Sequence, residues 1–411
     1  MTVSLNTLLN SSPAPYDLAP LLTILLLGAL LALGPLAWLW LRHRHAGPSA
    51  RLRALTVMTL FLTFDLVLFG AFTRLTDSGL GCPDWPGCYG SASPVGAAGD
   101  IHAAQSAMPS GPVTHAKAWI EMTHRYLATG VGGLIALLAI LSWVGLRKRE
   151  GLVDGEPKPS PWWATATLVW VCVQGAFGAL TVTLKLYPAI VTLHLLGGLG
   201  LLGLLAVQSQ GYERKPLQMP RSLFVGALVV AGLSAMQLAL GGWVSTNYAV
   251  LACREFPGCQ GSLWPEMDFA HGFTVLRELG AGRDGGYLPF AALTAIHYTH
   301  RLGAYAVLLG MTLLAWRLYA TAQPALRRWA FAIGAVAVWQ LASGLSNVVF
   351  GWPLIAAVAH TGGAAALVVL LSTMITRCLQ AKPQLKPKPQ ASTVVKPLSA
   401  GLAQAVWRKA P

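Results

Sequence analysis

The stretch EMTHRYLATGVGG (121–133) places a histidine and an arginine at the start of a long apolar run. The chain repeats this arrangement in AIHYTHRLGAYAVL (295–308), where His300 and Arg301 again precede apolar residues. Apolar runs of this kind are typical of membrane-spanning helices, in which ionisable side chains are costly and usually serve a function. The repeated His-Arg pair therefore indicates a membrane protein with a polar site inside it.

The composition of the 411-residue chain supports this interpretation, since 55% of the residues are hydrophobic and only 11% are charged. Soluble domains contain about 25% charged residues. We therefore predict an all-α polytopic membrane protein with nine spans. The expected helices cover residues 19–41, 52–73, 116–146, 162–184, 188–210, 222–246, 289–318, 327–350 and 353–378.

The net charge of +14 does not indicate a nucleic-acid partner, because the basic residues gather in alternate loops and in the tail. The positive-inside rule places those loops in the cytoplasm. We expect a multi-pass protein of a bacterial inner membrane, with its N-terminus outside and its C-terminus inside. The basic tail, residues 381–411, is expected to be disordered beside anionic lipid headgroups.

An internal repeat divides the chain, because residues of the first half recur in the same order in the second. The matched positions are Cys82 with Cys253 and Cys88 with Cys259 (171 apart), His124 with His300 (176 apart), and Gln174 with Gln340, Gly178 with Gly344 and His194 with His360 (166 apart). We expect two four-helix bundles of parallel topology after one extra helix. The predicted segments are 1–48, 49–215, 216–380 and 381–411.

Each half carries two histidines about 10 Å below the outer surface, given a rise of ~1.5 Å per helical residue. The pairs are His124 with His194 and His300 with His360. Two facing imidazoles suit the axial positions of a b-type haem. Zinc would usually need further cysteine or carboxylate ligands. Any single histidine could instead form an interhelical hydrogen bond.

The arginines next to the first histidine of each pair, Arg125 and Arg301, are placed to pair with haem propionates. They could instead extend to the membrane interface. His297 lies one turn before His300 and on nearly the same face, so either could be the ligand. His300 is preferred, because it aligns with His124.

Four cysteines form two short pairs in the expected outer loops, Cys82 with Cys88 and Cys253 with Cys259. Disulfides are expected on that side of the membrane, which is oxidising, although such a spacing could also bind a metal.

One acidic residue distinguishes the two halves. Glu121 precedes His124 by three residues and so faces the same pocket, whereas the matching position in the second half is His297. Glu121 is a candidate for proton transfer, or a helix-start carboxylate stabilised by the helix dipole. The difference suggests that the first half does the chemistry and the second carries electrons.

Together these residues resemble the heme A synthase family, membrane enzymes that convert haem O to haem A for terminal oxidases. The resemblance extends from about residue 55 to 375 and rests on the E-x-x-H-R motif at 121–125, the GLGCPDWPGC loop at 79–88, the second His-Arg pair, and the histidines at 194 and 360. Members of the family have eight helices in two four-helix halves. Helix 19–41 and an insertion at 91–115 depart from that pattern.

The resemblance implies that haem O binds between His124 and His194, with Glu121 as the catalytic carboxylate. It implies that His300 and His360 hold a permanent haem b. A methyl group of haem O would be oxidised to the formyl group of haem A by successive hydroxylation. Haem O synthase and terminal oxidase assembly factors are the protein partners that this function suggests, and the electron acceptor stays open.

Two other functions remain as alternatives. A di-haem quinone oxidoreductase of the b561 type would use four such histidines without modifying haem. A transporter or haem-delivery protein would account for the repeat alone. Haem analysis separates these alternatives, because only a synthase would carry haem O or haem A beside haem B.

Overall fold

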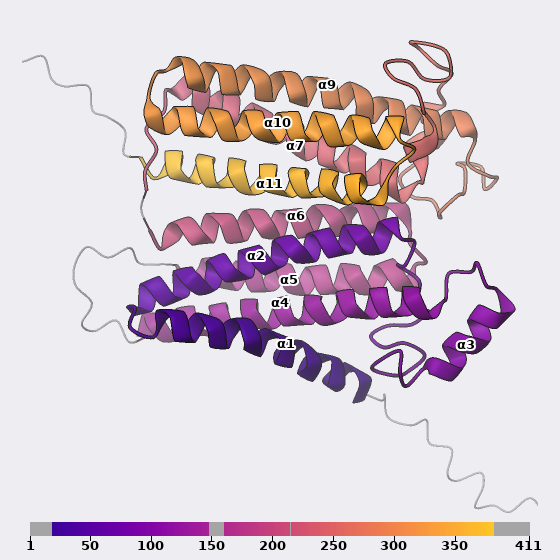
Figure 1. Ribbon diagram of the computed structural model, residues 1–411, viewed down its shortest axis with the longest axis horizontal. Helices are drawn as coiled ribbons and strands as arrows, with labels where there is room; N and C mark the ends of the chain where they lie inside the picture. Colours follow the sequence, from indigo (N-terminus) through magenta and orange to yellow (C-terminus); the bar gives the residue numbers. More distant parts are fainter. Residues whose placement is uncertain (1–18, 148–159, 214, 382–411) are drawn as a thin grey trace, which may run out of the picture.

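The computed structural model describes residues 19–147, 160–213 and 215–381, and these residues form an elongated helical bundle (Figure 1). Among the described residues, nine helices are long and apolar enough to cross a membrane, as predicted. They are α1 (Ala19–His43), α2 (Pro48–Leu75), α4 (His115–Arg147), α5 (Pro161–Thr183), α6 (Pro188–Gly211), α7 (Arg221–Thr246), α9 (Phe290–Ala320), α10 (Pro324–Val349) and α11 (Leu354–Leu379). Most of the predicted leader and tail, residues 1–18 and 382–411, lies outside the described residues.

Proline marks where most of these helices begin. A proline in the first turn costs no hydrogen bond, because the first N–H groups of a helix have no intrahelical partner. Pro48, Pro161, Pro188 and Pro324 occupy this position in α2, α5, α6 and α10. Prolines also immediately precede α7, α9 and α11. These start signals explain why the observed bounds agree with the predicted ones to within a few residues.

Contacts between the long helices form two closed groups of four. In the first group α4 packs against α2 and α5, and α6 also contacts both α2 and α5. In the second group α9 packs against α7 and α10, and α11 also contacts both of these. Helices α6 and α11 lie side by side where the groups meet (Figure 1). This arrangement supports the predicted duplication, which stays a prediction.

Unusual turns recur at corresponding positions of the two halves. A positive φ angle is uncommon outside glycine. Pairs of positive-φ residues are nevertheless separated by the offsets of the sequence repeat. They are Asp77 with Tyr248, Tyr89 with Gln260 and Gly90 with Gly261, each 171 apart, and Leu186 with Trp352, 166 apart. These matched turns are a second observation in favour of an internal repeat.

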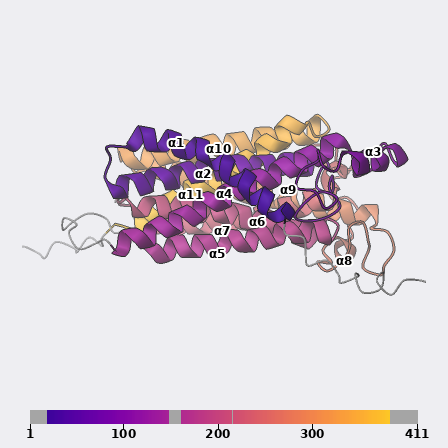
Figure 2. The same ribbon diagram turned by 90° about the horizontal axis from the view of Figure 1, so that it is seen from below.

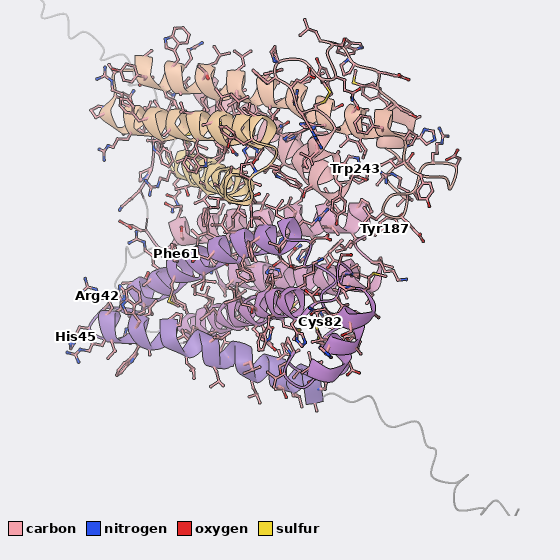
Figure 3. All side chains as sticks on the ribbon, turned by 45° about the vertical axis from the view of Figure 1, so that its right-hand side comes forward. Arg42, His45, Phe61, Cys82, Tyr187 and Trp243 are labelled. Carbon is pink, nitrogen blue, oxygen red and sulfur yellow. A yellow bond between two sulfur atoms is a disulfide. The ribbon has the colours of Figure 1, made fainter. Side chains whose placement is uncertain are left out.

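The two ends of the bundle differ in their loops. Arg42 and His45 lie at one end, which we call the basic end, whereas Cys82, Tyr187 and Trp243 lie at the other (Figure 3). We call the latter the disulfide end. The positive-inside rule would place the basic end in the cytoplasm. The observed separation agrees with the predicted orientation, which stays a prediction.

The insertion at 91–115 contains a helix, α3 (Ala98–Ala107), which packs against α4 at the disulfide end. The side chain of Ile101 is fully buried in a cluster with Cys82, Cys88 and Met122. The short helix α8 (Phe269–Gly272) lies at the same end (Figure 2). The insertion is therefore a folded cap over the first disulfide loop.

The extra helix α1 packs mainly against α4, on the outside of the first group (Figure 1). A glycine permits this close approach, as small residues commonly do between membrane helices. A Cβ at Gly28 would lie 2.6 Å from Thr129 Cγ2 and 2.9 Å from the Gly130 backbone nitrogen. Helix α1 is thus an added wall of the first half.

Replacing Gly28 by Leu should push α1 away from α4, because the backbone at Gly130 cannot move aside. Overpacking of this kind costs roughly 1–3 kcal/mol, so the thermal midpoint of the detergent-solubilised protein should fall. Gly34→Leu is the matched control on the same helix, since a Cβ there would meet nothing within 4 Å. Equal midpoints for the two variants would contradict the packing.

Candidate functional site

A cavity of about 930 Å³ lies inside the bundle, and every one of the nine long helices described above contributes to its wall. Ligand-binding pockets have volumes of about 300–1,000 Å³, so this cavity is at the large end of that range. All four predicted histidines line it, and so does Glu121. Residues of α1, among them Leu21 and Leu25, also line it. The extra helix therefore contributes to the site, which its sequence did not indicate.

The structure brings the histidines together in the predicted pairs. His124 and His194 come from α4 and α6, and His300 and His360 from α9 and α11. In each pair the two helices lie diagonally opposite in their group of four, and both imidazoles line the cavity. Both pairs therefore present nitrogen ligands to one shared, mostly apolar cavity.

A glycine on the neighbouring helix lies against each imidazole. A side chain at Gly70, Gly241 or Gly344 would crowd the ring, whereas a Cβ at Gly178 would lie at ordinary contact distance. The distances from a Cβ built on each glycine to the nearest imidazole carbon are 3.0 Å for Gly70 and His124, 3.5 Å for Gly178 and His194, 3.1 Å for Gly241 and His300, and 3.2 Å for Gly344 and His360. The four glycines follow the repeat offsets of 171 and 166.

Glu121 is buried and paired with two groups. Its Oε1 accepts a hydrogen bond from Arg125 Nη2 at 2.5 Å, and its Oε2 accepts one from the Cys82 backbone N–H at 2.8 Å. Arg125 also donates to the backbone carbonyls of Pro86 and Gly87. Charge-assisted bonds of this kind are strong and directional. They attach the first disulfide loop to α4.

Arg301 attaches the second disulfide loop to α9 in the same way. Its guanidinium donates to the carbonyls of Cys253 at 2.7 Å, Glu255 at 2.8 Å and Gly258 at 2.9 Å. The prediction that Arg125 and Arg301 pair with haem propionates stays untested. What the structure adds is that each guanidinium binds loop carbonyls.

His297, the alternative ligand, differs from His300 in its surroundings. Its Nδ1 lies 3.0 Å from the Ala249 carbonyl, and its Nε2 lies 3.3 Å from Arg301 Nε. The His297 Nε2 therefore accepts a hydrogen bond from Arg301, which occupies the lone pair that iron would need. This contact favours His300 as the ligand. It also shows that a loop-binding histidine takes the position that Glu121 has in the first half.

Both predicted cysteine pairs are disulfide-bonded, Cys82 with Cys88 and Cys253 with Cys259. Trp85 of the first loop and Phe256 of the second line the cavity. The two loops therefore lie against the cavity at the disulfide end.

Arg74 lies where the two halves meet at the disulfide end, and no motif of the sequence pointed to it. It lines the cavity, donates to the Ser245 carbonyl at 2.6 Å and lies 4.1 Å from the ring centroid of Tyr248. The Tyr248 hydroxyl in turn donates to Asp77 Oδ1 at 2.5 Å. The only sequence signal was an arginine near the end of an apolar run.

The donor set suits a haem better than a zinc ion. No group of three or more His, Cys, Asp or Glu side chains in the described part of the chain is placed to hold a metal ion. Tetrahedral zinc sites need three or four protein ligands. Paired imidazoles in an apolar cavity match the two axial positions of haem iron.

These features define a polytopic helical membrane protein with paired histidines in an internal cavity. Comparisons with known proteins identify its family. A family model described as cytochrome oxidase assembly protein (COX15-CtaA) matches residues 53–372. A heme A synthase of Shewanella oneidensis is 37% identical over 327 residues, which cover 77% of this chain and 93% of the relative. One of Chelativorans sp. is 29% identical over 335 residues, with 75% and 84% covered. The chain belongs to the heme A synthase family.

Replacing Arg125 by Gln should strongly destabilise the protein, because it leaves the buried Glu121 carboxylate without its counter-charge. Breaking a buried pair in this way costs about 3–5 kcal/mol. Adding Glu121→Gln removes the charge as well, so the double variant should lose less stability than the sum of the two single variants. Denaturation of each variant in detergent measures this coupling.

The control for that experiment is Arg53→Gln. Arg53 pairs with Glu213 at 2.5 Å, but their side chains are 45% and 34% exposed. Exposed pairs contribute about 0–1 kcal/mol, so the loss should be small. Additive losses for Glu121 and Arg125 would show that the buried pair is not coupled.

Proposed function

We propose that this protein is a heme A synthase, which oxidises a methyl group of haem O to the formyl group of haem A by successive hydroxylation. The observation that carries the proposal is that a buried carboxylate, Glu121, adjoins only one of two histidine pairs in a shared cavity. Membership of the heme A synthase family supports the same activity. No feature of the described residues specifically favours the b561-like alternative.

In this proposal the first half binds the substrate. His124 and His194 would hold the iron of haem O. We expect water to supply the formyl oxygen, so each hydroxylation would release two electrons and two protons. Glu121 takes up a proton, because each carboxylate oxygen keeps a second lone pair beyond the hydrogen bond that it accepts. Arg125 and the Cys82 backbone N–H hold the carboxylate in position.

The second half serves electron transfer. His300 and His360 would hold haem b, and this group supplies one-electron transfer when it is bound. Both pairs line one cavity, which supports electron transfer between the halves. Electrons withdrawn from the substrate leave through the second half to an external acceptor.

The proposed setting is a bacterial inner membrane, with the disulfide end and the N-terminus outside and the C-terminus in the cytoplasm. The loop arginines of the basic end support this orientation through the positive-inside rule. Haem O synthase, as the source of the substrate, and terminal oxidase assembly factors, as recipients of the product, are the proposed protein partners.

The Glu121→Gln variant tests the proposal. Gln keeps the shape of the side chain but cannot take up the proton, so conversion of haem O to haem A should stop while haem B is retained. The readout is chromatography of haems extracted from cells that supply haem O. Glu266→Gln, which changes an exposed glutamate at the disulfide end, should convert haem O normally. Haem A formation by Glu121→Gln would refute the assignment.

A further inference from the structure

Helix α1 has no counterpart in the predicted repeat. The offsets of the repeat match α2 with α7, α4 with α9, α5 with α10 and α6 with α11. The match to the family model begins at residue 53, after α1 has ended at His43. The contribution of α1 to the cavity is therefore specific to the first half and lies outside the part of the chain that the family model describes.

Two neighbouring stripes of α1 have different surroundings. Gly28 and Ala32 are buried, and Gly28 lies against α4. Leu21, Leu25 and Ala29 line the cavity instead. Residues four apart lie on one face of a helix. One stripe thus holds α1 against the bundle, and the next presents a continuous apolar surface to the cavity.

Three glycines of α4 and α5 line the cavity with nothing packed against them. Gly132 and Gly133 belong to α4, and Gly175 belongs to α5. A Cβ built on any of the three would meet no atom of the described residues within 4 Å. Glycine destabilises a helix relative to alanine, and close helix packing is its usual use in a membrane. These three glycines instead leave open space beside the cavity wall.

The second half has leucine at each of these positions. The matched pairs are Gly132 with Leu308 and Gly133 with Leu309, which are 176 apart, and Gly175 with Leu341, which are 166 apart. Three bulky apolar side chains thus stand where the first half has none. The added helix and the open glycines therefore enlarge the same half of the cavity.

We call the part of the cavity that these residues line the α1 recess. Its members are Leu21, Leu25, Ala29, Gly132, Gly133 and Gly175. Helix α4 packs against both α1 and α5, so residues of three contacting helices form the recess. None of the six side chains can form a hydrogen bond. The recess therefore suits an apolar chain and offers nothing to a polar group.

The recess adjoins the first histidine pair. Gly178 follows Gly175 by about one turn of α5, and a Cβ at Gly178 would lie 3.5 Å from the His194 imidazole. Thr129 of α4 also lines the cavity, and its hydroxyl donates to the Arg125 carbonyl at 2.8 Å. That hydroxyl is thus satisfied within its own helix. A ligand held between His124 and His194 could extend an apolar substituent into the recess.

We propose that the α1 recess binds the farnesyl chain of haem O and so distinguishes the substrate from haem B. Haem O carries this long apolar chain, which haem B lacks. The recess lies in the half to which the proposed function assigns haem O. The half assigned to haem b has neither the extra helix nor the open glycines. The inference rests on the proposed function, because that function assigns haem O to the first half.

Titration of the purified full-length protein with haem O and with haem B, followed by Soret absorbance, tests the proposal. The ratio of the two affinities isolates the contribution of the chain. Burying a leucine-sized apolar group changes an affinity about tenfold or more. Leu25→Ala should therefore weaken haem O binding by roughly tenfold and leave haem B binding unchanged. Gly133→Leu introduces the residue of the second half, fills the recess and should have the same selective effect.

Matched controls come from α1. Leu26→Ala changes a leucine that is 65% exposed and does not line the cavity. Gly34→Leu changes a glycine that also has open surroundings among the described residues, but does not line the cavity. Both controls should bind haem O and haem B with wild-type affinities.

Wild-type affinity for haem O in both Leu25→Ala and Gly133→Leu would overturn the inference and would leave a lipid acyl chain as the occupant of the recess. An equal loss for haem O and haem B would overturn it too, because it would show a purely structural role. His124→Ala separates these results from failure of the proposed function. If His124→Ala abolishes haem O binding to the first half while the recess variants do not alter it, only the inference fails. If His124→Ala binds haem O like the wild type, the first pair does not hold the substrate, and both fail.

Discussion

An imidazole inside the hydrocarbon layer is costly unless its nitrogens are bonded, and this constraint governs the protein. Four imidazoles line one cavity within a bundle of apolar helices. A glycine opposite each ring gives it room, and each pair comes from helices that lie diagonally opposite in their group of four, α4 with α6 and α9 with α11. Several ionisable side chains inside a membrane-spanning bundle are typical of a functional site. The two proposed haem sites would account for all four rings together.

The disulfide loops are bound to the bundle by the same helices that carry the histidines. Arg125 and Arg301 each follow a histidine directly and bind carbonyls of the adjoining loop. The position of the loop is therefore coupled to the helix that presents the ligand. The halves diverge one turn earlier, where Glu121 in the first half corresponds to His297 in the second. A buried carboxylate thus adjoins the first pair, and an imidazole that contacts the Ala249 carbonyl takes its place beside the second.

Much of the architecture could be predicted because it follows from local signals. Span-length apolar runs define the nine helices, and the repeated Cys, His and Gly positions align the halves. The fold of the insertion could not be predicted, because α3 is short and its burial depends on Ile101 packing against the first disulfide loop. The contribution of α1 to the cavity depends on the close approach at Gly28, which needs the position of α4.

The site was predictable in its ligands and not in their partners. His124, His194, His300 and His360 stand out because ionisable residues are rare in such helices. Gln237 and Ser343 contact histidines 63 and 17 residues away, and such contacts depend on how each helix is rotated. The contacts of Arg125 and Arg301 could not be predicted for the same reason. Their sequence position is compatible with propionates or with loop carbonyls, and only the folded loops show the carbonyl contacts.

Acid extraction of haems from the purified wild-type protein, followed by chromatography, tests the central claim most directly. If the histidine pairs are a substrate site and a permanent site, the extract should contain haem B together with haem O or haem A. An extract with haem B alone from cells that make haem O would instead indicate an electron-transfer protein. An extract without any haem would contradict the assignment of the four imidazoles.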